Sequence, residues 1–431
     1  MRPPPGEVVG DTAALPGYAR RADTDQGARS RAGAKTTGRI ALLNPAWITV
    51  AASLGLVGVG LTGISLASGL SGSGLTPLAV RQATFLALGV GVASVAAIFD
   101  YRRLSRHVHW LAIGTLGLLV FVLIPFIPES IVRPVNGARR WINLGVADFQ
   151  PSELAKVVFV LLVGAWLRFR STQRTWLGLM APALMAVVPM GLILVEPDLG
   201  TAVLFMPALV AMLVAAGAKL AHLLTTCAIG VVFAASVAGT SLLLAQADQY
   251  PLLRPHQVER IQAMLDVYRG DERFVDGRGF QGRQARMLVG AGGVAGHDEE
   301  RARALVHFSS LPERHNDMVY AVIANRFGVA GGVGVLTLYG LWIAGALWTA
   351  GRCKDAFGRI MVVGFAAFVF TQMSINIGMT IGLLPITGMT LPFVSYGGSS
   401  LLMAWLMVGL VMSVALRRPS KLWRESFEFG R

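Results

Sequence analysis

Long apolar runs alternate with short polar segments over most of the chain. Each run is close to the roughly 20 residues that an α-helix needs to cross the hydrocarbon core of a bilayer. The runs lie at residues 47–68, 79–99, 108–127, 153–167, 176–195, 199–216, 221–245, 318–349, 357–382 and 398–416. This pattern predicts an all-α polytopic membrane protein with about ten transmembrane helices.

The polar connections differ in charge between the two sides of the predicted bundle. Basic residues recur on one side, at Arg102, Arg103, Arg106, Arg168, Arg170, Arg174, Lys219, Arg352, Lys354, Arg359, Arg417, Arg418, Lys421 and Arg424. The opposite connections at 69–78, 196–198 and 383–397 contain neither Lys nor Arg. Because Lys and Arg concentrate in cytoplasmic loops, the basic side and both termini are predicted to be cytoplasmic.

The two ends of the chain lack apolar periodicity. Residues 1–44 are rich in Gly, Ala, Arg and Asp and predict a disordered cytoplasmic tail, and residues 419–431 form a second short cytoplasmic tail. No signal-peptide pattern precedes the first apolar run, so that run is expected to remain as a membrane anchor. Residues 45–418 are therefore the predicted ten-helix membrane domain.

One large extracytoplasmic loop, residues 246–316, is predicted between spans seven and eight. It contains ten Arg and ten acidic residues, so its net charge is zero and the predicted orientation stands. Loops of this length are usually functional or disordered. The glycine-rich part, Val289–Gly296, is compatible with a phosphate-cradling turn, but no strand precedes it and a flexible linker is favoured.

Composition agrees with this architecture and excludes some functions. The chain is 54% hydrophobic and 14% charged, with a mean hydropathy of +0.58, which is more apolar surface than a soluble fold buries. The net charge of +14 comes from short basic groups between apolar runs, so nucleic-acid binding is not expected. Two cysteines, Cys227 and Cys353, provide neither a disulfide framework nor a metal cluster.

A dense polar cluster, Leu311–Asp317, leads directly into the eighth apolar run. A carboxylate at the mouth of a membrane helix is costly to desolvate, so Asp317 is a candidate functional residue, with His315 beside it. The alternative is a solvated helix start in which Asn316 or Asp317 serves as the N-cap.

A second polar group begins the fourth span. Ser152 is the expected N-cap, and Glu153 and Lys156 are three residues apart on one helix face, where they can pair. In a soluble helix this would be a cap with an intrahelical ion pair. Near a membrane such a pair more often faces a polar cavity, which is the favoured interpretation here.

Further polar residues are predicted on the same side. Glu196 and Asp198 lie in a very short turn and either cap helices or join an outward cavity that suits proton transfer or a metal ion. Arg139 and Arg140 carry planar guanidinium groups that match phosphate oxygens. No Ser-His-Asp order or nucleophile elbow is present, which argues against a covalent acyl enzyme.

The stretch from Asn376 to Ser400 contains Pro385, Pro392 and paired glycines, so it predicts a helix that breaks and then reforms. Broken backbone at membrane depth is tolerated where it lines a cavity or is buried in protein. Close packing of small residues is the alternative explanation for its glycines and serines, among which Ser395 is a candidate cavity residue.

Five motifs together resemble the SEDS family, the RodA/FtsW-type peptidoglycan polymerases. They are Asn136-Gly-Ala-Arg-Arg-Trp-Ile142, Phe149-Gln-Pro-Ser-Glu-Leu-Ala-Lys156, Glu196-Pro-Asp-Leu-Gly-Thr201, Leu311-Pro-Glu-Arg-His-Asn-Asp317 and Asn376–Ser400. They cover spans three to ten in the family's order. The chain departs from the family at Glu196, where Gln is usual, at Asn316, where Thr is usual, and over Gly296–His307.

The resemblance implies a ten-span enzyme of the bacterial inner membrane that polymerises lipid II, an undecaprenyl-diphosphate-linked disaccharide peptide, into glycan strands for cell shape or cell division. It implies that Asp317 is the catalytic residue and that Glu153, Lys156 and Asp198 line the same outward cavity. The implied partners are a class B penicillin-binding protein and other elongation or division proteins. No cofactor is required by the sequence, although a divalent cation, Mg or Mn, is compatible.

The chemistry fits one general base. A sugar diphosphate-lipid donor already carries a good leaving group, so Asp317 needs only to deprotonate an acceptor hydroxyl, and a glycosidase-like acid partner is unnecessary. Two other functions share these features: a lipid-linked precursor flippase or transporter, and a scaffold that recruits a transpeptidase. The motif at Asn376–Met379 leans toward the elongation-type RodA, and the sequence leaves the oligomeric state and the role of the tail open.

Overall fold

The structure is a computed structural model that describes residues 44–68, 76–135, 138–145, 147–169, 174–247, 258, 261–262, 265 and 279–417. The predictions for the tails and for most of residues 248–278 lie outside this part of the chain. Within it the helices are α2 (Ala46–Ala67), α3 (Pro77–Ile98), α4 (Tyr101–Leu123), α5 (Pro151–Leu167), α6 (Trp176–Val195), α7 (Leu199–Val203), α8 (Phe205–Ala215), α9 (Leu220–Gln246), α11 (Phe280–Gly292), α12 (Glu299–Phe308), α13 (Val319–Arg352), α14 (Ala356–Thr380) and α15 (Gly398–Leu416).

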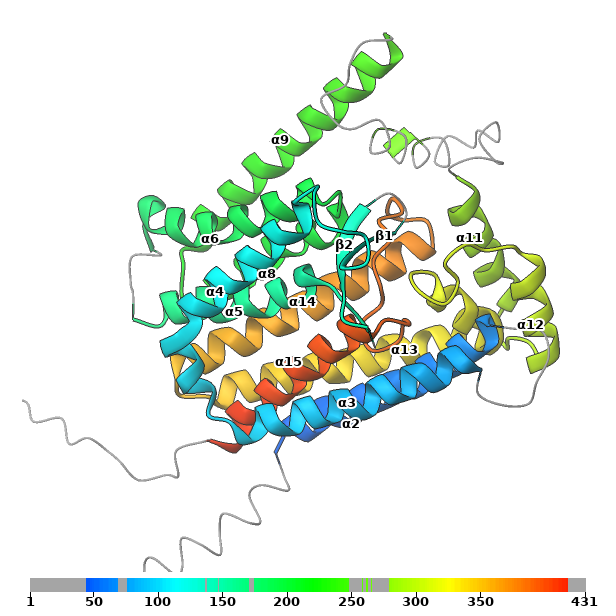
Figure 1. The fold of residues 1–431 in the computed structure, drawn as a ribbon, viewed down its shortest axis with the longest axis horizontal. Helices are drawn as coiled ribbons and strands as arrows, with labels where there is room; N and C mark the ends of the chain where they lie inside the picture. The colour runs from blue at the N-terminus through cyan, green and yellow to red at the C-terminus, as the bar shows by residue number, and fades with distance from the viewer. Residues whose placement is uncertain are drawn as a thin grey trace, which may run out of the picture. The chain divides into compact units, whose positions relative to one another are not determined.

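The predicted helical spans are confirmed. Among the described residues, eight helices are long and apolar enough to cross a membrane: α2, α3, α4, α6, α9, α13, α14 and α15. The predicted span at 199–216 is divided into α7 and α8, which meet at Leu204, and the span at 153–167 is the 17-residue helix α5. The chain is thus a multi-pass membrane protein, and Figure 1 shows its helices packed side by side.

Helices α5, α14 and α15 form the most protected part of the bundle. Two-thirds or more of the most apolar stretches of α14 and α15 are buried, whereas α9 is buried over only 6% of its stretch and leaves the bundle in Figure 1. Phe159 of α5, Phe205 of α8 and Phe368 of α14 meet edge to face, with centroids 5.0–6.0 Å apart. These aromatic contacts fix the helices that carry the polar residues described below.

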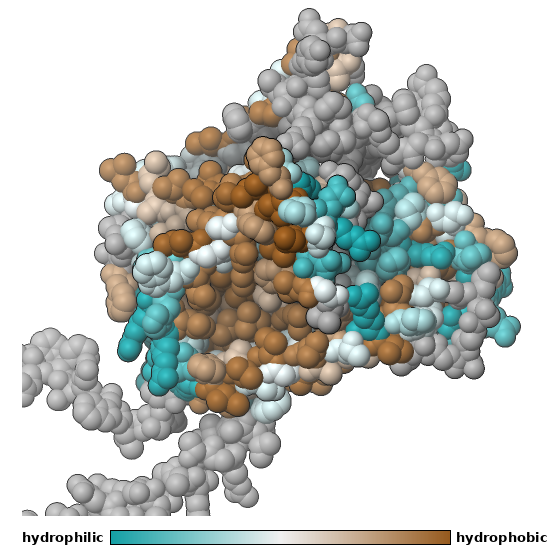
Figure 2. Space-filling view, in the orientation of Figure 1, coloured by the Kyte–Doolittle hydropathy of each residue, from teal (hydrophilic) through white to brown (hydrophobic). Residues whose placement is uncertain are grey.

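A small sheet, which helical periodicity did not predict, lies between α4 and α5. Strands β1 (Val132–Val135), β2 (Ala138–Asn143) and β3 (Asp148–Phe149) pair antiparallel in the order β1-β2-β3. We call the end of the bundle that carries these strands the sheet end. Figure 2 shows hydrophilic side chains gathered at this end and apolar side chains over the helices.

The glycine-rich part at 289–296 is not a flexible linker, so this prediction was wrong. Its first four residues are helical, in α11, and the chain then packs against α13. A Cβ on Gly292 would lie 2.2 Å from the main-chain oxygen of Ala324, and one on Gly328, at φ +63°, would lie 2.3 Å from the main-chain oxygen of Val294. These glycines allow two backbones to touch, because any side chain would force them apart.

Candidate active site

Asp317 lies near the end of the loop that precedes α13. This loop, residues 309–318, is called the aspartate loop below. Helix α13 has Met318 as its N-cap and no side-chain cap, so neither Asn316 nor Asp317 caps it. Asp317 is only 7% exposed. A buried carboxylate that does not cap its helix supports the functional interpretation of this residue over the solvated helix start.

The main chain between α14 and α15, residues 381–397, is the predicted break in the helix, and we call it the broken segment. It contains no helix or strand, and it passes directly beside Asp317. A Cβ on Gly388 would lie 3.6 Å from Asp317 Oδ2. Gly388 has a φ of +71°, so the chain turns here in a conformation that other residues rarely adopt.

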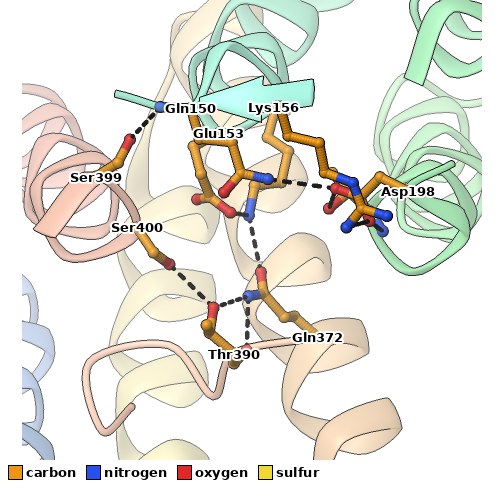
Figure 3. A network of polar contacts seen from close by, with 10 residues as sticks. Gln150, Glu153, Lys156, Asp198, Gln372, Thr390, Ser399 and Ser400 are labelled. Carbon is orange, nitrogen blue, oxygen red and sulfur yellow. Dashed lines mark hydrogen bonds and ion pairs between the residues drawn. The ribbon is translucent and has the colours of Figure 1, made fainter. Parts of the chain in front are cut away.

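Glu153 and Lys156 form the predicted pair on α5. Lys156 Nζ lies 2.8 Å from Glu153 Oε1 and donates a second bond, of 3.0 Å, to Gln372 Oε1 of α14. Both side chains are at least nine-tenths buried. Figure 3 shows this network continuing from Gln372 to Thr390 and Ser400, so α5 is tied to the broken segment. Separating such a pair would leave an uncompensated buried charge.

The helix that carries this pair begins differently from the prediction. Gln150, rather than Ser152, is the N-cap of α5, because Pro151 takes the first helical position and needs no N–H partner there. Ser152 lies inside the helix, and its buried hydroxyl has no hydrogen-bond partner among the described residues. The main-chain N–H of Gln150 instead donates to Ser399 Oγ, 3.1 Å away, at the start of α15.

Asp198 performs one of the two roles that the sequence left open, because it caps a helix. Its Oδ1 accepts from the N–H of Thr201 and caps α7, and its Oδ2 accepts from Thr201 Oγ1 at 2.8 Å. Oδ2 also accepts from Gln150 Nε2 at 3.3 Å, and Arg140 Nη1 lies 4.0 Å from Oδ1. The cap therefore belongs to the same polar network as the start of α5 (Figure 3).

Glu196, two residues before Asp198, is a buried carboxyl group without hydrogen-bond partners among the described residues. It is 1% exposed. Burial, together with the negative charge of Asp198, raises its pKa to about 8, although Arg140 opposes this shift. The group is therefore mostly protonated at neutral pH.

The two predicted phosphate donors, Arg139 and Arg140, both hold main chain. Arg139 donates to the carbonyls of Pro125 and Ile127, just before the sheet. Arg140 donates to the carbonyls of Glu196, at 2.9 Å, and of Pro197. The Arg140 bonds join β2 to the turn between α6 and α7, so this arginine fixes the turn that presents Asp198.

His315 and Ser395 contribute contacts around the aspartate loop. The imidazole of His315 stacks edge to face with Tyr396 at 5.9 Å, and burial lowers its pKa. It borders a cavity of about 530 Å³ that opens toward α2, α3 and α12 and is lined by Ala67, Ser68, Leu78, His307, Ser310, Leu311, Glu313, Arg314 and His315. Ser395 Oγ accepts from the N–H of Leu391 and donates to the carbonyl of Asn316.

Two residues that were not singled out, Gln372 and Asn376, connect these groups. They are four residues apart on one face of α14. Gln372 Nε2 donates to the carbonyl of Thr390 at 2.8 Å, and Asn376 Nδ2 donates to the carbonyls of Met389 and Asp317. Amide side chains inside an apolar run were the available signal, since a buried amide requires partners.

Two of the candidate carboxylates, Glu153 and Asp198, already have cationic groups beside them. In the described residues no group of three or more His, Cys, Asp or Glu is placed to hold a metal ion. Glu153 is bound to Lys156, and Asp198 accepts from Thr201 and Gln150 with Arg140 nearby. Cations already compensate both carboxylates, so we assign no step to a metal, and the compatibility with Mg or Mn stays a prediction.

The fold and the site define a class: a multi-pass membrane protein with a buried, non-capping carboxylate and a charged network beside a broken helix. Residues 42–419 match the family of FtsW, RodA and SpoVE cell cycle proteins. The chain belongs to this family.

Relatives of known name agree on the class of enzyme. The chain is 32% identical to the probable peptidoglycan glycosyltransferase FtsW of Pseudomonas fluorescens, over 88% of this chain and 90% of that protein. It is 34% identical to the protein of the same name from Thioalkalivibrio sulfidiphilus, over 84% and 87% of the two chains.

Two solved structures have the same fold. One belongs to work on the structural coordination of polymerization and crosslinking by a peptidoglycan synthase complex; it has a TM-score of 0.70 and 31% identity, and the match covers 86% of this chain and 98% of that one. The other is the rod shape determining protein RodA of Thermus thermophilus, with a TM-score of 0.61 and 28% identity over 87% and 97% of the chains.

Proposed function

We propose that this protein, a peptidoglycan glycosyltransferase by its family, polymerises lipid II into glycan strands with Asp317 as the general base. The relatives that are named as this class of enzyme match the chain over most of their length. The observation that supports the role of Asp317 is its burial beside the broken segment without a capping role. Two other predicted cavity residues are linked to the same segment: Ser395 lies in it, and Lys156 is bonded to Gln372, which donates to Thr390.

In the proposed reaction the Asp317 carboxylate accepts the proton of an acceptor sugar hydroxyl. The hydroxyl oxygen attacks the anomeric carbon of the donor, the bond from that carbon to the diphosphate-lipid breaks, and the anomeric configuration inverts. Attack and departure occur on opposite faces, so one base is sufficient and no covalent enzyme intermediate forms. Lys156, held between Glu153 and Gln372, contributes fixed positive charge near the reacting groups.

We further propose that the sheet end faces outward across the bacterial inner membrane, with both termini in the cytoplasm. The basic connections at the other end of the bundle support this orientation. A class B penicillin-binding protein is the proposed partner, because one similar structure comes from a complex that couples polymerisation and crosslinking. The relatives by sequence are named FtsW and one structural match is RodA, so the lean toward the elongation type stays a prediction.

The experiment is a glycan polymerisation assay on purified protein with labelled lipid II, with and without its co-purifying partner. A polymerase makes strands whose length grows with time, and Asp317→Asn makes none. A flippase would move lipid II across vesicles without joining sugars. A scaffold would support growth in cells after Asp317→Asn, so each alternative has its own readout.

A further inference from the structure

Three consecutive main-chain carbonyls of the aspartate loop are each bound by a donor from distant sequence. The N–H of Tyr396 donates to the carbonyl of His315 at 3.0 Å. Ser395 Oγ donates to the carbonyl of Asn316 at 2.5 Å, and Asn376 Nδ2 donates to the carbonyl of Asp317 at 2.8 Å. Two of these three donors are side-chain groups, and they come from the broken segment and from α14.

We propose that Asn376 and Ser395 are positioning residues of the active site, which hold the peptide units on both sides of Asp317 so that its carboxylate has one fixed place. This proposal rests on the proposed role of Asp317 as the base. Neither residue needs to touch the substrate, because each acts on the main chain that carries the carboxylate.

Local bonds hold the turn before Asp317, since the N–H groups of Asn316 and Met318 donate to the carbonyl of Glu313 at 3.0 and 3.4 Å, while the carbonyls of residues 315–317 accept from distant donors. Asp317 precedes α13, outside the helical hydrogen-bond ladder, and α13 has no side-chain cap. A base must lie within hydrogen-bond distance of the proton that it removes, and misplacement by about 1 Å can cost on the order of a hundredfold in rate. Bonds to successive peptide units restrict the backbone on either side of the carboxylate.

The donors are themselves firmly held. Asn376 is fully buried, and its amide also donates to the carbonyl of Met389 at 2.6 Å. The broken segment is held from α3, where Gln82 Nε2 donates to the carbonyl of Ser395 at 2.9 Å and Gln82 Oε1 accepts from the N–H of Gly397. Tyr339 of α13 donates to the carbonyl of Pro392. The anchors therefore connect the aspartate loop to three membrane helices.

The structure offers matched controls for both side chains. Asn325 of α13 is also fully buried, and its Nδ2 also donates to a main-chain carbonyl, that of Leu288 at 3.1 Å. Ser413 of α15 is a buried serine whose Oγ donates to the carbonyl of Phe99. Neither bond involves the aspartate loop, so the controls reproduce the loss of a buried hydrogen bond without moving Asp317.

The test compares Asn376→Ala and Ser395→Ala with Asn325→Ala and Ser413→Ala in the full-length protein, with its partner where it co-purifies. Polymerisation is measured over a range of lipid II concentrations. The rate is divided by the amount of folded protein, which is taken from the cooperative melting transition. We expect kcat to fall on the order of tenfold to a hundredfold in the first two variants, with KM within about twofold. The controls keep kcat within about twofold despite a similar loss in melting temperature.

Two more variants sharpen the result. Asn376→Asp keeps the size of the side chain but presents a second acceptor to the carbonyls of Asp317 and Met389, so it should lose as much kcat as Asn376→Ala. The double variant Asn376→Ala/Ser395→Ala should lose less than the product of the single losses, because both residues hold adjacent peptide units.

Normal kcat per folded molecule, a rise in KM alone, or equal losses in the controls would each overturn the positioning role. If Asn376→Ala does not fold, Ser395→Ala against Ser413→Ala decides the question by the same criteria. Failure here is separate from failure of the proposed function. Polymerisation by Asp317→Asn would contradict the role of Asp317 as the base. An inactive Asp317→Asn together with fully active Asn376→Ala and Ser395→Ala would contradict only the positioning role.

Discussion

The Glu153–Lys156 pair and Asp317 are both buried charged groups, but the chain fixes them in opposite ways. The pair is carried by a regular helix, where a spacing of three residues by itself brings the two side chains together. Asp317 is carried by irregular backbone, and donors from residues 59 to 81 positions away hold the neighbouring peptide units. The comparison teaches that a regular element supplies geometry locally, whereas a loop-borne base depends on the rest of the bundle.

The largest effect in this comparison is expected from the carboxylate itself. Asp317→Asn keeps the shape of the side chain but cannot accept a proton, so polymerisation should fall on the order of a hundredfold to ten-thousandfold. Insertion into the membrane and the melting temperature should change little. The measurement is strand synthesis per folded molecule, and near-normal synthesis would show that burial at this position is structural.

The ion pair is expected to show a large effect on both stability and activity. Lys156→Ala leaves Glu153 buried with its cation removed, which costs on the order of 3–5 kcal/mol in comparable cases. The double variant Glu153→Gln/Lys156→Met removes both charges and should regain most of the melting temperature but not the rate. Recovery of the rate as well would mean that the pair serves folding alone.

Replacing a glycine by alanine should lower stability in the irregular broken segment and raise it in a regular helix. Gly388→Ala places a side chain at φ +71°, which costs about 1–2 kcal/mol. Its Cβ would lie 3.6 Å from Asp317 Oδ2, an ordinary contact, so kcat should change less than stability. Gly191→Ala on the open face of α6 should stabilise by about 0.5–1 kcal/mol. Thermal melting in detergent measures the stability of both variants. Equal changes in their melting temperatures would contradict the difference between the irregular segment and the helix.

The smallest effect is expected at Glu196 and depends on pH. Its folded-state pKa of about 8 lies above its ordinary value of 4.5, so between these pH values the folded state binds more protons and stability falls as pH rises. Glu196→Gln removes that loss. The variant should gain little in melting temperature at pH 5 and progressively more as the pH rises to 8.5. A gain that is independent of pH would show that the carboxyl is not the cause.

Sequence patterns predicted what depends on local spacing. Apolar runs located the spans, and the i, i+3 spacing located the Glu153–Lys156 pair. The polar cluster before the eighth span made Asp317 a candidate, and the motif resemblance implies that it is catalytic. These features need only neighbouring residues or a known family pattern to be recognised.

Features that depend on distant contacts were missed or misread. The glycines at 289–296 resembled a linker because nothing in their own sequence reveals the backbone of α13 against them. Arg140 resembled a phosphate donor, whereas its partners are carbonyls 56 and 57 positions away. Asn376 was not singled out, because its bond to the carbonyl of Asp317 depends on the packing of α14.

The length of α5 has a consequence for how the protein enters its membrane. At about 1.5 Å per residue its 17 residues extend about 25 Å, less than the roughly 30 Å of hydrocarbon in a bilayer. Most of its residues are buried in the folded protein. A short helix is therefore tolerated, because its surroundings are mainly other helices and not lipid. A translocating segment that carries both Glu153 and Lys156 partitions poorly on its own. Stable integration of α5 is therefore coupled to the arrival of α14, which lies more than 180 residues further along the chain and brings Gln372 to Lys156.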